Sequence, residues 1–146
     1  MAAEPASRSQ GHQLQLRWLP GTFAVCRLPP SATLNPALFA SGSSSDFVGV
    51  IKTKAELSIL APSEACSGGW VEEAGGKADG GWVGLEVQGP MAFDMVGVMA
   101  QLASTLAAAD VSLLAQSSFD TDYIFVKEGG KPAAHKALVD SGCLVV

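Results

Sequence analysis

The spacing of apolar residues changes twice between Trp82 and Lys127, and these changes predict the elements of the C-terminal half. A period of two at Val83, Leu85 and Val87 predicts a strand with one buried face, which Gly89-Pro90 ends. From Phe93 to Ala107 the apolar residues follow helical spacing instead, in two stripes that leave few polar positions. Such a helix is expected to be covered on both sides.

After Asp110 the period returns to two, which predicts a strand over residues 111–116 and a second strand over residues 123–127. The short segment 117–121 between them predicts a hairpin connection. Pro132 is placed to begin a helix over residues 131–141, and Gly142 stands where a C-terminal cap belongs. Residues 143–146 are expected to form a last short strand.

This order of strand, helix, strand, strand, helix, strand defines a fold class. With right-handed crossovers it gives an α+β, ferredoxin-like βαββαβ arrangement: a four-stranded antiparallel sheet with both helices on one face. Gly97 falls inside the predicted first helix, where glycine costs roughly 1 kcal/mol relative to alanine. A close approach by a backbone or ligand would explain it, and so would simple packing with a tolerated glycine.

The first half of the chain shows a weaker version of the same order. Alternation from Leu14 to Trp18 and again from Phe23 to Leu28, around Pro20-Gly21, predicts a hairpin. The remaining predicted elements are a short helix over residues 34–40, strands over 47–53 and 56–61, and one helical turn over 63–66. This half therefore reads as a degenerate copy of the second.

Residues 67–81 carry six glycines and no sustained period, which is typical of a linker or exposed loop. The predicted organisation is a tail over residues 1–13, a first module over 14–66, the linker over 67–81, and a second module over 82–146. Each module is expected to hold its own sheet.

The residue composition and net charge limit the kinds of molecule that this protein is expected to bind. Hydrophobic residues make up 48% of the chain and charged residues 16%, which indicates a folded protein. The net charge of -5 and the lack of a basic stripe argue against nucleic acid or an anionic membrane as partner. No apolar run approaches the ~20 residues that span a bilayer, so we expect a cytoplasmic protein. The cysteines, expected to be reduced and buried, are Cys26, Cys66 and Cys143.

Two ordered blocks of sequence resemble a known family. KTKAELSIL in the first half, followed by QGPMAFDMVGVMAQLASTLAAADVSLLAQSSFDTDYIFVK in the second, is similar to proteins that carry two ACT modules in one short chain. The second block also resembles the ligand-binding ACT module of the eukaryotic cytosolic arginine sensor. The resemblance implies a non-catalytic regulatory protein that binds a small molecule, typically an amino acid, where two ACT modules meet.

The resemblance also implies which residues contact the ligand. They fall at a helix start, at a hairpin and on a facing strand: Ala92, Phe93, Asp94 and Val98; Ser118, Phe119 and Asp122; Ser58 and Ile59. Met95 stands where the sensor carries an acidic residue, so one charge for the cationic end of arginine is missing.

The residue types suit an amino acid without reference to any family. Backbone N–H groups after Pro90, at the positive end of the predicted helix, would accept a carboxylate. Asp94, Asp120 and Asp122 offer carboxylates for an ammonium group, and Phe93 or Phe119 an apolar surface. Each also has a structural alternative: Asp94 complements the helix dipole, Asp120 suits a turn, and Ser58 suits the exposed side of an edge strand.

Three functions follow from these observations. The first is an amino-acid-binding regulatory protein, paired as a homodimer, that alters a protein partner when ligand binds. The second is a protein–protein interaction module without a small-molecule ligand. The third and weakest is an enzyme of unrecognised type, since no nucleophile with a base, no metal-ligand spacing and no cofactor motif is evident. His135 is expected on a solvated helix face.

Overall fold

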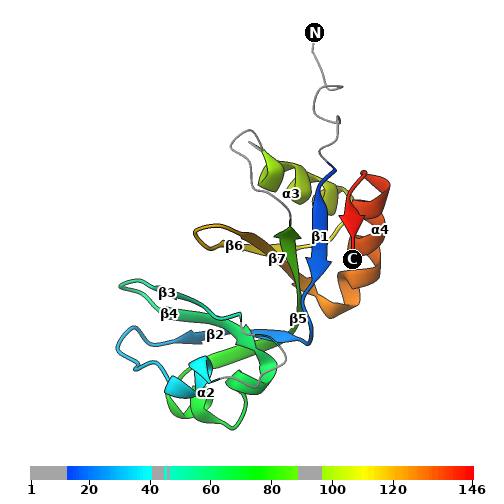
Figure 1. The fold of residues 1–146 in the computed structure, drawn as a ribbon. Coiled ribbons are helices and arrows are strands. Elements are labelled where there is room, and N and C mark those ends of the chain that lie inside the picture. Colours follow the sequence, from blue (N-terminus) through cyan, green and yellow to red (C-terminus); the bar gives the residue numbers. More distant parts are fainter. Residues whose placement is uncertain (1–12, 41–44, 46, 89–96) are drawn as a thin grey trace. The chain divides into compact units, whose positions relative to one another are not determined.

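The computed structural model describes residues 13–40, 45, 47–88 and 97–146. These residues form two compact units (Figure 1): unit 1 comprises residues 13–18 and 85–146, and unit 2 comprises residues 19–84. The elements, in chain order, are β1 (Gln15–Trp18), β2 (Phe23–Leu28), η1 (Pro36–Phe39), β3 (Gly49–Lys52), β4 (Leu57–Pro62), η2 (Ser63–Cys66), α2 (Trp70–Glu73), β5 (Lys77–Gln88), α3 (Val98–Ala108), β6 (Leu113–Ser117), β7 (Asp122–Lys127), η3 (Glu128–Gly130), α4 (Lys131–Asp140) and β8 (Leu144–Val145).

Unit 2 contains four antiparallel strands in the order β3-β4-β2-β5, the last being the first part of β5. The segments η1, η2 and α2 are short helical pieces between strands. Numbered along the chain from β2, this is the strand order 2-3-1-4 of a βαββαβ unit with its helices reduced to single turns. The predicted degenerate copy therefore has a closing strand that the sequence analysis did not assign to it.

The core of unit 2 lies on one face of this sheet. It is formed by residues from β2, β4 and the short helices: Ala24, Cys26, Leu28, Leu38, Leu57, Ile59, Ala61, Cys66 and Val71. All three cysteines of the chain are buried and reduced, as the sequence predicts. The hydrogen bond between the Cys26 and Cys66 thiols, together with burial, raises the pKa of Cys26 above that of an ordinary thiol. The Cys26 thiol therefore packs as a small uncharged core group at neutral pH.

Unit 1 has the predicted element order β5, α3, β6, β7, α4, β8, but with one more strand. β1 pairs antiparallel with residues 85–88 of β5 and parallel with β8, so β8 does not lie beside β5. The sheet order is β6-β7-β5-β1-β8, and the sheet is mixed rather than wholly antiparallel. The N–H groups of Leu144 and Val146 donate to the carbonyls of Leu14 and Leu16, both at 2.8 Å, which fixes the extra strand in place.

The hairpin predicted around Pro20-Gly21 does not form. β1 and β2 are both antiparallel to β5, β1 at residues 85–88 and β2 at residues 77–82, and they belong to different units. Alternating hydrophobicity predicts that each segment is a strand, but it does not specify the pairing partner. The turn residues at this point carry the chain from one unit into the other.

The predicted linker over residues 67–81 is a folded segment. It contains α2 and the first residues of β5, so the two units divide near residues 18 and 84 rather than at 67 and 81. Gly76 shows why glycine is needed here: a Cβ at this position would lie 2.6 Å from the backbone oxygen of Arg27. A close approach of two backbones, and not a flexible connection, accounts for part of the glycine content.

Gly97 lies before α3 and not inside it. Its φ of 85° is left-handed, and it occupies the N-cap position, with the described helix beginning at Val98. Since L side chains rarely adopt this φ, the glycine is explained by backbone geometry at the helix start. Leu102 and Leu106, from one predicted stripe of α3, are buried, whereas Ala100 and Ala107 from the other stripe are exposed.

Candidate ligand site

The start of α3 and the β6–β7 hairpin lie at the same end of unit 1. Figure 1 shows the first turn of α3 and the tip of the hairpin on the same side of this unit. The arrangement follows from chain order, because α3 carries the chain back across the sheet and β6 then runs in the direction of β5. Val98, Ser118, Phe119 and Asp122 are thereby brought to one end of the unit.

The hairpin tip is a tight turn held by its own polar groups. The Ser118 N–H donates to the Thr121 carbonyl at 2.8 Å, and the Thr121 N–H donates back to the Ser118 hydroxyl oxygen at 3.2 Å. These bonds confirm the predicted hairpin connection. They give Ser118 a role in the turn, while its exposed position leaves the hydroxyl accessible to solvent.

Asp122 begins β7 and has one neutral partner. The hydroxyl of Ser117, its cross-strand neighbour, donates to the Asp122 carboxylate at 2.6 Å. A carboxylate has about four acceptor sites, so one hydrogen bond leaves acceptor capacity for an ammonium group. Asp122 is half-buried and forms no ion pair within the described part of the chain.

Phe119 stands at the tip of this turn with its side chain 101% exposed. A fully exposed phenylalanine has no packing contact that would account for its presence in the isolated unit. The predicted site residues of the helix start that precede Val98 are Ala92, Phe93 and Asp94, and they lie outside the described residues.

Ser58 and Ile59 belong to unit 2, on β4. This strand lies between β3 and β2, so it is not the edge strand that the sequence analysis considered for Ser58. Ile59 has an exposure of 0% and packs in the core of its unit. Ser58 points to the other face of the sheet, where it lines an open groove with residues of β2 and β5.

The sheet of unit 1 carries an ion pair that sequence reasoning did not identify. Arg17 on β1 lies opposite Glu86 on β5, and its guanidinium Nη2 is 2.6 Å from Glu86 Oε1, which also accepts from Gln88 at 3.0 Å. Tyr123 on β7 lies close to the same carboxylate. Burial raises the pKa of Tyr123, and the negative charge of Glu86 raises it further. No sequence signal links these residues, because they meet only through strand register.

His135 is exposed on α4, as the sequence predicts, and it also contacts β1. Its Nδ1 accepts a hydrogen bond from the Trp18 indole N–H at 3.1 Å, and the two rings stack with centroids 6.4 Å apart. The Lys131 ammonium lies 4.8 Å from the centroid of the Trp18 ring. These contacts hold α4 against β1, so we assign Trp18, Lys131 and His135 a structural role.

Residues 77–140 match the family model of the ACT domain. The match begins at the first residue of β5 and ends at the last residue of α4. The segment thus has an ACT-type α+β fold, although the match spans less than half of the chain. No curated protein gives a significant match to the sequence.

Solved structures extend the likeness in fold to most of the chain. A protein from Agobacterium tumefaciens is 24% identical, with a TM-score of 0.79 over 92% of this chain and 93% of that one. Aspartate kinase from Clostridium acetobutylicum, described as an allosteric enzyme, is 14% identical, with a TM-score of 0.65 over 88% of this chain and 34% of that chain. The regulatory subunit of aspartate kinase from Thermus thermophilus is 13% identical, with a TM-score of 0.57 over 83% and 93%.

At these low sequence identities, the structural similarity shows a shared fold only. The comparisons do not support the resemblance to the arginine sensor. Among the described helices, none has the length and apolar character required to cross a bilayer.

Proposed function

We propose that this protein is a non-catalytic regulatory protein that binds an amino acid where two ACT modules meet. The observation that carries the proposal is the ACT-family match over residues 77–140. Within that range, α3 starts at the same end of unit 1 as the hairpin that bears Ser118, Phe119 and Asp122. The likeness in fold to a regulatory subunit of aspartate kinase supports it.

In this proposal the ligand carboxylate binds at the helix start and the ammonium group is accepted by Asp122, whose carboxylate has acceptor capacity left beside Ser117. Phe119 covers the apolar side chain of the ligand. The protein acts in the cytoplasm as a homodimer, and ligand binding selects one packing of the modules that a partner protein recognises. The role of Ile59 is limited to its backbone, because its side chain is in the core.

A thermal-melt panel against the common amino acids tests the proposal. A ligand at about 100 times its dissociation constant adds about 2.7 kcal/mol to stability, a shift of roughly 5–10 °C for a chain of this size. We expect one amino acid or a small group of related ones to produce this shift. A flat panel across all of them contradicts the proposal.

Two variants test whether the thermal shift depends on the Asp122 carboxylate. Asp122→Asn removes the charge that would accept the ammonium group and should abolish the shift. Ser117→Ala is the matched control, since it removes the hydrogen bond of 2.6 Å to Asp122 and leaves the carboxylate charge intact. An equal loss of the ligand shift in both variants would assign Asp122 to hairpin structure instead of ligand binding.

The full exposure of Phe119 supports a second candidate, an interaction module without a small-molecule ligand. In that case Phe119→Ala should weaken self-association in sedimentation equilibrium with no amino acid present. Phe39→Ala is the control, because Phe39 is also strongly exposed, at 62%, but lies on η1 in unit 2.

A further inference from the structure

One face of the unit 2 sheet carries a row of side chains that register places side by side. Ile51 on β3 is paired with Ser58 on β4, Ser58 with Arg27 on β2, and Arg27 with Lys77 on β5. All four point away from the core, because their neighbours Ile59, Cys26 and Leu28 point into it. The row therefore presents a hydroxyl, a guanidinium and an ammonium group on the face of the sheet opposite to this core, the face that also carries the buried Phe23 and Leu60.

The pairing of Arg27 with Lys77 is unfavourable by itself. Like charges directly opposite each other on adjacent strands repel and destabilise the sheet. Among the described residues neither side chain has an ion-pair partner that would relieve the repulsion. An anion bound between them would do so, with Ser58 as a further donor.

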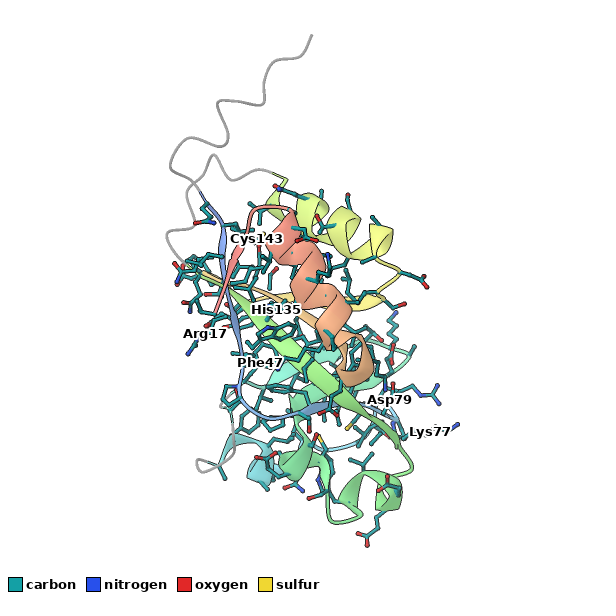
Figure 2. All side chains as sticks on the ribbon, turned by 90° about the vertical axis from the view of Figure 1, so that its right-hand side faces the viewer. Arg17, Phe47, Lys77, Asp79, His135 and Cys143 are labelled. Carbon is teal, nitrogen blue, oxygen red and sulfur yellow. The ribbon has the colours of Figure 1, made fainter. Side chains whose placement is uncertain are left out.

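An open groove of about 340 Å³ is lined by Ser58, Arg27 and Lys77 of this row, and its volume is within the range of small-molecule sites. Two carboxylates, Glu56 and Asp79, line it together with the two cations, and Val25 forms an apolar part of its floor. Lys77 and Asp79 are two residues apart on β5 and so lie on the same face of the strand (Figure 2). The lining charges sum to zero, which disfavours a highly charged anion such as phosphate.

We propose that this groove is a binding site for a zwitterionic amino acid. The ligand carboxylate lies between Arg27 and Lys77 and accepts from the Ser58 hydroxyl, which neutralises the like-charge pair. The ammonium group lies toward Glu56, which precedes β4 and lines the groove. A neutral ligand with separated charges can pair with the guanidinium, ammonium, hydroxyl and carboxylate groups of the groove. A simple anion is repelled by the Glu56 carboxylate.

This site lies within unit 2 and does not depend on the ligand site proposed for unit 1. The two are separated by the variant Asp122→Asn, which should leave binding at the groove unchanged. Retained groove binding with no effect of any unit 1 substitution would support this inference and contradict the other proposal.

Nuclear magnetic resonance titration of the full chain with each common L-amino acid, and with inorganic phosphate, tests the inference. We expect at least one amino acid to shift the amide signals of residues 25–27, 58 and 77–79. Arg27→Gln and Lys77→Gln should each weaken this binding at least about tenfold, since each removes a charge-assisted hydrogen bond. Lys52→Gln is the matched control, because Lys52 is exposed in the same unit but is paired with Leu57, whose side chain faces the core.

Glu56→Gln distinguishes a zwitterion from an anion. It should weaken amino acid binding and strengthen phosphate binding, because the same carboxylate attracts one ligand and repels the other. The inference is overturned if no amino acid shifts these amides, if Arg27→Gln and Lys77→Gln bind as the wild type does, or if phosphate binds as tightly as the best amino acid.

Discussion

Two arginines of this protein pair in register with residues of the same strand, β5, and have opposite surroundings. In unit 1, Arg17 lies opposite Glu86 and forms an ion pair of 2.6 Å. In unit 2, Arg27 lies opposite Lys77. Both arginines are exposed on the sheet surface, so the difference comes from the partner that β5 supplies.

The comparison distinguishes an arginine whose charge is neutralised within the protein from one whose charge can bind an external anion. The Glu86 carboxylate accepts from Arg17 and Gln88, so Arg17 has little capacity to attract an external anion. The donors of Arg27 and Lys77 are not engaged by ion pairs within the described residues. A pair that neutralises itself stabilises a sheet, whereas a like-charged pair costs stability unless a ligand or partner neutralises it.

The largest effect is expected from the two cores. Ile59→Ala in unit 2 and Leu106→Ala in unit 1 each truncate a side chain with an exposure of 0% and should cost about 2–5 kcal/mol. Because β5 contributes a strand to both units, we expect one cooperative unfolding transition in urea for each variant. Two separated transitions would contradict this coupling. A small loss of stability in Ile59→Ala would contradict a core role for this side chain and would favour its predicted role as a ligand contact.

Glu86→Lys converts the unit 1 pair into a copy of the unit 2 pair. It should lower the free energy of unfolding by about 1 kcal/mol, through loss of the ion pair and new repulsion with Arg17. Chemical denaturation at low and high salt measures the change, and high salt should reduce it. Unchanged stability at low salt would show that the ion pair has no net effect.

Lys77→Glu is the reverse change, which gives Arg27 an opposite charge as Arg17 has. We expect a gain of a few tenths of a kcal/mol, smaller because both side chains are exposed. The same variant should lose amino acid binding at the groove, so stability and affinity move in opposite directions. Loss of both together would indicate that Lys77 has a packing role.

The smallest effect concerns Tyr123, the single tyrosine of the chain. Its pKa is raised from 10.0, first by burial and then by Glu86, so ultraviolet titration should show ionisation above pH 10. The neutral side chain contributes stability that is fully present below pH 10 and is lost as the pH rises through the raised pKa. In Glu86→Gln the titration midpoint of Tyr123 should fall toward the ordinary value. An unchanged midpoint would show that the Glu86 carboxylate does not raise the pKa of Tyr123.

The sequence was most informative where one element could be read from its own residues. The order from β5 to β8, the β6–β7 turn and the cap at Gly142 follow from local periodicity and turn chemistry, and the structure confirms them. The predicted helical turn at 63–66 is also present. Ser118, Phe119 and Asp122 were assigned to a hairpin, and they are on one.

Pairing between distant segments could not be predicted in this way. Leu14 to Trp18 has the same alternation whether it pairs with β2, as expected, or with β5 and β8, as it does. In the glycine-rich segment 67–81, Gly76 is required by a close backbone approach to Arg27, which leaves no periodic signal in the sequence. The groove residues Arg27, Ser58 and Lys77 are far apart in the chain and carry no common motif.

The sequence by itself determined the element types, the ACT-like order of the C-terminal segment and the chemistry available in each side chain. Only the tertiary structure decided that β5 serves both units, that Ile59 is a core residue, and which charge each arginine meets. The physical reason is that local periodicity fixes which face of a strand is buried, whereas strand register, set by the whole sheet, fixes which side chains become neighbours.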